Sequence, residues 1–116
     1  AIPAPCSDVD LEWWRTNTEI GAGMANDNWG WTSSDTGVEY ALAAMNSGTA
    51  FLRVADGSQV GFLPTATSSS SWRDIKVYDH YAFIVSEASS HGLQIFDLKA
   101  LDAAEEDDET FDATLT

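Results

Sequence analysis

The sequence is poor in the residues that structural zinc sites and basic binding surfaces require. Its 116 residues include one cysteine, two histidines and five lysines or arginines, against nineteen aspartates and glutamates. A single cysteine forms no disulfide within the chain, and Cys6 with two histidines is too small a set for a structural zinc site. The formal net charge of −14 repels phosphate backbones, so we expect no nucleic-acid partner.

Long apolar runs and catalytic motifs are also missing. No stretch approaches the roughly 18 apolar residues of a membrane-spanning helix, so we expect no membrane insertion in this segment. No Gly-x-Ser-x-Gly sequence positions a nucleophile, and the stretch Gly21-Ala22-Gly23 precedes no strand-to-helix signal of a phosphate-binding loop. We therefore expect no catalytic residues, no cofactor-binding residues and no enzymatic activity.

What the chain does contain is enough apolar material for one folded domain, with 44% hydrophobic and 11% aromatic residues. Residues 1–25 form an irregular lead-in. From residue 26 onward, short runs rich in β-branched and aromatic residues alternate with turn formers such as Asp56-Gly57-Ser58. These patterns predict strands at residues 28–32, 39–45, 49–55, 59–66, 75–78, 81–86 and 93–98, then an acidic loop at 102–110 and an outer strand near 110–115.

The strand-rich region repeats itself. Trp31 and Trp72 are 41 residues apart, and beyond the next hairpin a spacing of 44 residues pairs Gly48 with Gly92. The chain therefore divides into a first unit at residues 26–67 and a second at 68–116. The residues expected to anchor these units structurally are Trp31, Trp72, Arg73, Asp74, Tyr40, Tyr81, Gly48 and Gly92.

A strand-only repeat of about 40 to 45 residues, with four strands in each unit, is typical of a β-propeller blade. We therefore predict an all-β fold with two four-stranded antiparallel blades, in which runs such as AFIV and LQIF are covered on both faces. A propeller closes with about four to eight blades, so two blades would leave edges and an apolar face open. The expectation is a partial propeller, completed by missing blades of a longer parent chain or by other protein chains.

Three stretches carry a family resemblance. They are APCSDVDL at residues 4–11, NDNWGWTSSDTGVEYALAAMNSGTAFLRVAD at 26–56 and VGFLPTATSSSSWRDIKVYDHYAFIVSEASSHGLQIFDLKAL at 60–101. Together they resemble the choice-of-anchor B proteins, whose propellers are built from LVIVD repeats. The resemblance implies an extracellular, secreted or cell-surface protein in which propellers mediate binding.

The resemblance also bears on individual residues. The family's repeat has a glycine, an apolar run, an aspartate and another apolar residue, and residues 92–98 fit it, whereas Arg53 stands in the first unit where Asp97 stands in the second. By the residues alone, Cys6 is either a free thiol or paired outside this chain. The resemblance implies the second, an extracellular disulfide to a cysteine that this chain does not contain.

The leading functional hypothesis is a non-enzymatic module for protein–protein interaction or for assembly of a surface structure. One alternative is a hydrolase or carbohydrate-binding propeller whose site needs blades absent from this chain, with Asp74 and Glu87 as its convergent acids. Calcium is the one cofactor for which the chain offers ligands, at Asp27, Asp35 and Asp56, although the same residues are ordinary turn formers.

Overall fold

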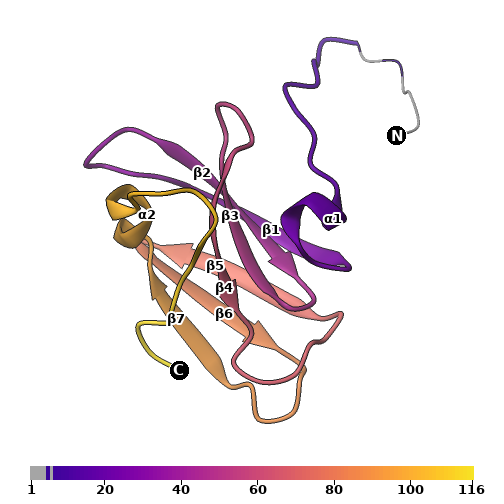
Figure 1. The fold of residues 1–116 in the computed structure, drawn as a ribbon, viewed down its shortest axis with the longest axis vertical. Coiled ribbons are helices and arrows are strands. Elements are labelled where there is room, and N and C mark those ends of the chain that lie inside the picture. The colour runs from indigo at the N-terminus through magenta and orange to yellow at the C-terminus, as the bar shows by residue number, and fades with distance from the viewer. Residues whose placement is uncertain (1–4, 6) are drawn as a thin grey trace.

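The computed structural model describes Pro5 and residues 7–116, and its strands form two sheets that pack face to face (Figure 1). The first sheet is built around two neighbouring strands of small and apolar residues. Asn46 and Ser47 connect these strands, so that Met45 pairs with Gly48. In the order across the sheet, its strands are β1 (Ala25–Thr32), β2 (Glu39–Met45), β3 (Gly48–Arg53), β4 (Gln59–Pro64) and β8 (Glu109–Thr110).

The second sheet is an antiparallel meander of three strands. Asp79 and His80 form the tight turn between its first two strands, and the positive φ of Asp79 (55°) is a conformation that aspartate tolerates better than most residues. Its strands are β5 (Arg73–Tyr78), β6 (Tyr81–Ser86) and β7 (Leu93–Asp97). The all-β class predicted from the sequence is confirmed, and the seven predicted strands appear within a few residues of their expected ends.

The core lies between the two sheets because strand side chains alternate from face to face. Leu42 and Phe51 of the first sheet and Ile84 and Phe96 of the second are each at most 2% exposed. The rings of Phe51 and Phe96 stack across the junction, with their centroids 4.9 Å apart. Such offset stacking adds to the area buried by each ring.

Two short helices flank the sheets. α1 (Asn17–Ile20) begins with a capping box, in which the Thr16 side chain accepts from the backbone N–H of Glu19 and the Glu19 side chain accepts from that of Thr16. α2 (Lys99–Ala103) buries Leu101 in the core. Part of the predicted acidic loop is therefore helical.

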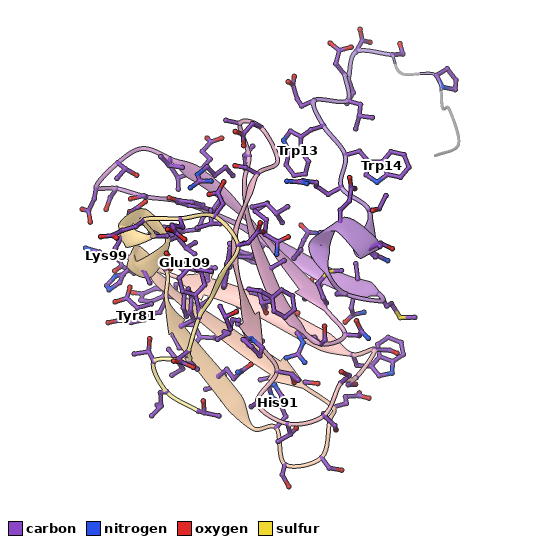
Figure 2. All side chains as sticks on the ribbon, in the orientation of Figure 1. Trp13, Trp14, Tyr81, His91, Lys99 and Glu109 are labelled. Carbon is purple, nitrogen blue, oxygen red and sulfur yellow. The ribbon has the colours of Figure 1, made fainter. Side chains whose placement is uncertain are left out.

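The part of the lead-in around Trp13 and α1 docks on the far side of the first sheet. Trp13 packs with Ile20 against a second apolar cluster formed by Met45, Ala50 and Leu52. Its indole N–H also donates to Val54 O, in the hairpin between β3 and β4, at a distance of 2.5 Å. Figure 2 shows Trp13 beside that hairpin, with Trp14 on the same segment.

The outer strand predicted for the second unit forms differently. β8 pairs in parallel with β4 of the first sheet, and only one isolated bridge, between Ile95 and Leu115, continues the second sheet. The cause is Phe111, whose ring packs against Phe51 and Phe96 between the sheets and draws the preceding residues toward the first sheet. The second unit therefore has three full strands rather than four.

The strand registers also correct the sequence repeat. Tyr40 and Tyr81 do lie at the start of equivalent strands, but Tyr40 pairs with Trp31 whereas Tyr81 pairs with Tyr78. The counterpart of Trp31 is therefore Tyr78, and the equivalence of Trp31 with Trp72 is wrong. The 41-residue spacing misleads here because the loop joining β1 and β2 is longer than the two-residue turn joining β5 and β6.

Candidate interaction face

The side of the second sheet that faces away from the first sheet is a candidate interaction surface, which we call the outer face. Alternation along the strands sends one set of side chains into the core and the other set outward. Among the outward set, Tyr78 is 79% exposed, Val85 44% and Leu93 42%, while Phe83 and Ile95 are half-buried. The outer face consists of Asp74, Lys76, Tyr78, Tyr81, Phe83, Val85, Leu93, Ile95 and Asp97.

The runs AFIV and LQIF, expected to be covered on both faces in a complete propeller, are covered on one face only, as expected where two units leave an apolar face open. Ala82 and Ile84 are buried, but Val85 in the same run is exposed. In the second run Phe96 is buried and Leu93 is exposed. Half of each run faces the core, and the other half makes the outer face apolar.

Arg73 fixes β5, the first strand of this sheet, to the first sheet. Its side chain is buried, at 2% exposure, and its guanidinium donates to Met45 O at 2.8 Å, to Thr65 Oγ1 at 2.7 Å and to His91 Nε2 at 3.0 Å. Burial lowers the pKa of Arg73, which still keeps its charge. The predicted anchoring role of Arg73 fits this geometry.

An ion pair between Arg73 and Asp74 does not form, because adjacent residues in a strand point to opposite faces. Asp74 lies 2.8 Å from Nζ of Lys76 instead, on the outer face. Trp72, also expected as an anchor, is 60% exposed. The two glycine anchors differ from each other: a Cβ on Gly48 would overlap with Leu63 O, whereas one on Gly92 would meet nothing within 4 Å.

A cavity of about 310 Å³ opens at the edge of the outer face. Trp72, Asp74 and Glu87 line it, together with Asn26 and Val85. The structure thus brings together the two acids that the alternative hypothesis singled out, beside an exposed indole. Carboxylates and an aromatic ring are groups that can hold a sugar, but Asp74 is already paired with a lysine.

A second cavity, of about 220 Å³, contains His80 and Lys99 next to Trp31. His80 Nδ1 lies 2.5 Å from the carboxylate of the preceding Asp79, and this contact lowers the pKa of Asp79. Ser34 also lines the cavity. Among the described residues no hydrogen bond joins His80 to a serine, so the arrangement lacks the nucleophile–base contact of a catalytic triad.

Asp102 is a half-buried junction that the sequence did not indicate. Its carboxylate accepts hydrogen bonds from Ser33 Oγ at 2.5 Å, Thr36 Oγ1 at 3.1 Å and the Tyr40 hydroxyl at 2.8 Å. Burial raises the pKa of Asp102, but the three hydrogen bonds outweigh it, and the net pKa is lowered. Burial and the same contact raise the pKa of Tyr40 to about 12. Asp102 therefore ties α2 to the loop joining β1 and β2.

The three calcium candidates lie apart and have separate partners. Asp27 accepts the backbone N–H of Ile75, a bond that lowers the pKa of Asp27. Asp35 pairs with Lys99 at 3.2 Å, and Asp56 accepts from Ser58 in its own turn. Within Pro5 and residues 7–116, no three His, Cys, Asp or Glu side chains are grouped so that they could hold a metal ion. Cys6 lies outside the described residues.

None of the family models, curated proteins and solved structures with which the chain was compared matches it. In the part of the chain that the structure describes, no helix is both long enough and apolar enough to cross a membrane.

Proposed function

We propose that this chain is a non-enzymatic, extracellular β-propeller piece that serves as a module for protein interaction or for assembly of a larger structure. The observation that supports this function is the uncovered apolar outer face of the second sheet. A contiguous apolar patch on one sheet face is typical of a surface that another protein covers. The propeller architecture is supported by the repeated unit and by the face-to-face packing of the two sheets.

Covering the outer face would be favourable in proportion to the area removed from water. Val85 and Leu93 each keep somewhat less than half of their surface exposed. Full burial of such side chains contributes about 1.5–3 kcal/mol each, so the remaining part contributes about 1 kcal/mol each. Phe83 and Ile95 lie between charged and apolar neighbours on the same face and would add to this contribution.

The experiment combines Val85→Lys with Leu93→Lys, which places two charges on the outer face without touching the core. We expect the natural chain to bind a hydrophobic dye in a fluorescence titration, and the double variant to lose most of this binding. Val9→Lys, at a residue that is 71% exposed on the lead-in, is the matched control. Equal dye binding by the natural chain and the double variant would contradict the proposal.

A carbohydrate-binding or hydrolytic function is the second candidate, because Trp72, Asp74 and Glu87 share one cavity. Titration with soluble oligosaccharides, followed by indole fluorescence, tests it directly. A saturable signal that Trp72→Ala abolishes would favour this candidate over the interaction module. A flat signal in the natural chain would remove its support.

A further inference from the structure

The junction between the two sheets is fixed by side chains of β1 that satisfy backbone groups of β5 and its turn. β5 pairs with β6 along one edge only, which leaves N–H groups on its other edge. Asn26 Oδ1 accepts the N–H of Arg73 at 2.8 Å, and Asp27 Oδ2 accepts the N–H of Ile75 at 3.0 Å. At the other end of the strand, the Trp31 indole N–H donates to Asp79 O at 2.9 Å. These contacts set the position of the second sheet along the first.

Two of these polar positions recur on the outer face of the second sheet. Asp27 pairs with Ala44 across β1 and β2, and Asp74 pairs with Val85 across β5 and β6. Ala44 and Val85 are equivalent, because each lies four residues beyond the tyrosine at the start of its strand, which is the second residue of β2 (Tyr40) and the first of β6 (Tyr81). Asp74 therefore occupies the place of Asp27, and by the same registers Tyr78 occupies the place of Trp31.

The apolar part of the junction recurs in the same way. Leu42 of the first sheet faces the core, and its counterpart in the second sheet, Phe83, faces outward. Phe51 likewise faces the core, and its counterpart Ile95 lies on the outer face beside Phe83. The outer face thus presents a carboxylate, a hydrogen-bonding aromatic residue and an apolar centre in the arrangement that already holds one sheet in this molecule.

Building on the interaction module proposed above, we propose that the outer face receives a further antiparallel sheet of the same repeat, whose first strand donates a backbone N–H to Asp74. The Tyr78 hydroxyl then donates to a carbonyl of that sheet's first turn, as Trp31 does here. The facing side of the incoming sheet carries small and aliphatic residues, as Ala82 and Ile84 do against the first sheet.

A second intact copy of this chain has no suitable side to offer. The matching side of its second sheet is buried against its own first sheet. The equivalent side of its first sheet, around Ala50 and Leu52, is covered by Trp13 and Ile20 of the lead-in. The occupant is therefore an additional sheet of this type, and the lead-in closes the opposite end of the stack.

The test is a chain extended after Thr116 by a second copy of residues 68–116, which supplies such a sheet in covalent linkage. We expect the appended counterpart of the Ile75 amide to become protected from hydrogen exchange. Asp74→Ala in the original copy should speed that exchange by about tenfold or more, since it removes a hydrogen bond to a charged acceptor. Asp112→Ala, at an exposed carboxylate away from the outer face, is the control. The same Asp74 substitution in the unextended chain measures any effect on the fold itself.

The outcomes separate this inference from the function on which it rests. If the appended sheet folds and abolishes dye binding while Asp74→Ala leaves the exchange unchanged, the role of Asp74 is overturned and the interaction module stands. If the appended amide stays unprotected and dye still binds, the proposed occupant is wrong. A dimer of the unextended chain that buries Val85 and Leu93 would also overturn it. The interaction module itself fails if the unextended chain binds no dye, or binds it equally well after Val85→Lys and Leu93→Lys.

Discussion

Replacing Arg73 by methionine tests the junction between the two sheets, because methionine keeps an unbranched apolar stem and lacks the charged guanidinium. The guanidinium of Arg73 reaches Met45 O, Thr65 Oγ1 and His91 Nε2 at 2.7 to 3.0 Å, and it is buried. His91 Nε2 acts as an acceptor here, while Nδ1 of the same ring lies 3.0 Å from Gly92 O. Figure 2 shows His91 at the end of the second sheet, where this network lies.

The expected cost of this substitution follows from the three hydrogen bonds. Each bond from a charged donor contributes about 1.5–3 kcal/mol net, which gives roughly 6 kcal/mol for the set. Burial of the methionine side chain recovers about 2 kcal/mol. We therefore expect Arg73→Met to lower the free energy of unfolding by about 4 kcal/mol, a large fraction of the roughly 5–15 kcal/mol that a domain of this size has in total.

Urea unfolding followed by circular dichroism measures this loss. Arg73→Lys should fall between the natural chain and Arg73→Met, because one ammonium group cannot reach three acceptors that lie in different directions. Lys76→Met removes an exposed cation from the same strand and should cost much less. A loss below about 1 kcal/mol for Arg73→Met, or equal stability with lysine and arginine, would refute the assignment of Arg73 as the anchor of this junction.

Three further predictions concern the fold that presents the outer face. Asp102→Asn should flatten the decline of unfolding free energy between about pH 5 and pH 3, because a carboxyl whose pKa is lowered by folding stabilises the chain above its unfolded pKa and loses that contribution on protonation; unchanged pH dependence in chemical denaturation would count against it. Gly48→Ala should cost about 3 kcal/mol of overpacking, whereas Gly30→Ala, whose new Cβ meets only one backbone atom at 4.0 Å, should be mild, and equal melting temperatures would contradict the packing argument. Trp13→Ala should release the lead-in and speed tryptic cleavage after Arg15, while Trp14→Ala, at a residue 52% exposed, should not; identical digestion rates would show that the docked contact contributes little.

Much of the fold could be predicted from the sequence, because the residue patterns that indicate strands and turns are local. Short apolar runs between turn formers placed seven strands, and the β2–β3 turn follows from Asn46 and Ser47 beside Gly48. The repeat identified Tyr40 and Tyr81 correctly because the spacing is constant through that part of both units. The repeat wrongly paired Trp72 with Trp31. Both residues lie nine positions before a tyrosine, but the two hairpins differ in loop length, so a different residue, Tyr78, pairs with the second tyrosine.

The candidate site was less predictable, since it depends on contacts between residues far apart in the chain. The bond from Ser33 to Asp102 spans 69 residues, and no pattern near either residue indicates it. The local pattern predicted an outer strand in the second unit. Instead, Phe111 packs between the sheets, and β8 pairs with β4 of the first sheet. The alternative hypothesis named Asp74 and Glu87 as convergent acids. That they line one cavity follows from the pairing of β5 with β6 and from the loop after β6, which the sequence pattern does not show.

By itself, the sequence determined the all-β class and the order of the strands, because alternation, β-branched residues and turn formers act over a few neighbouring positions. It also determined the shortage of basic side chains, of cysteine and of histidine. Only the tertiary structure decided which half of each apolar run is covered. That choice depends on whether a second sheet lies against a given face, and in this molecule a sheet covers Ile84 and leaves Val85 in water.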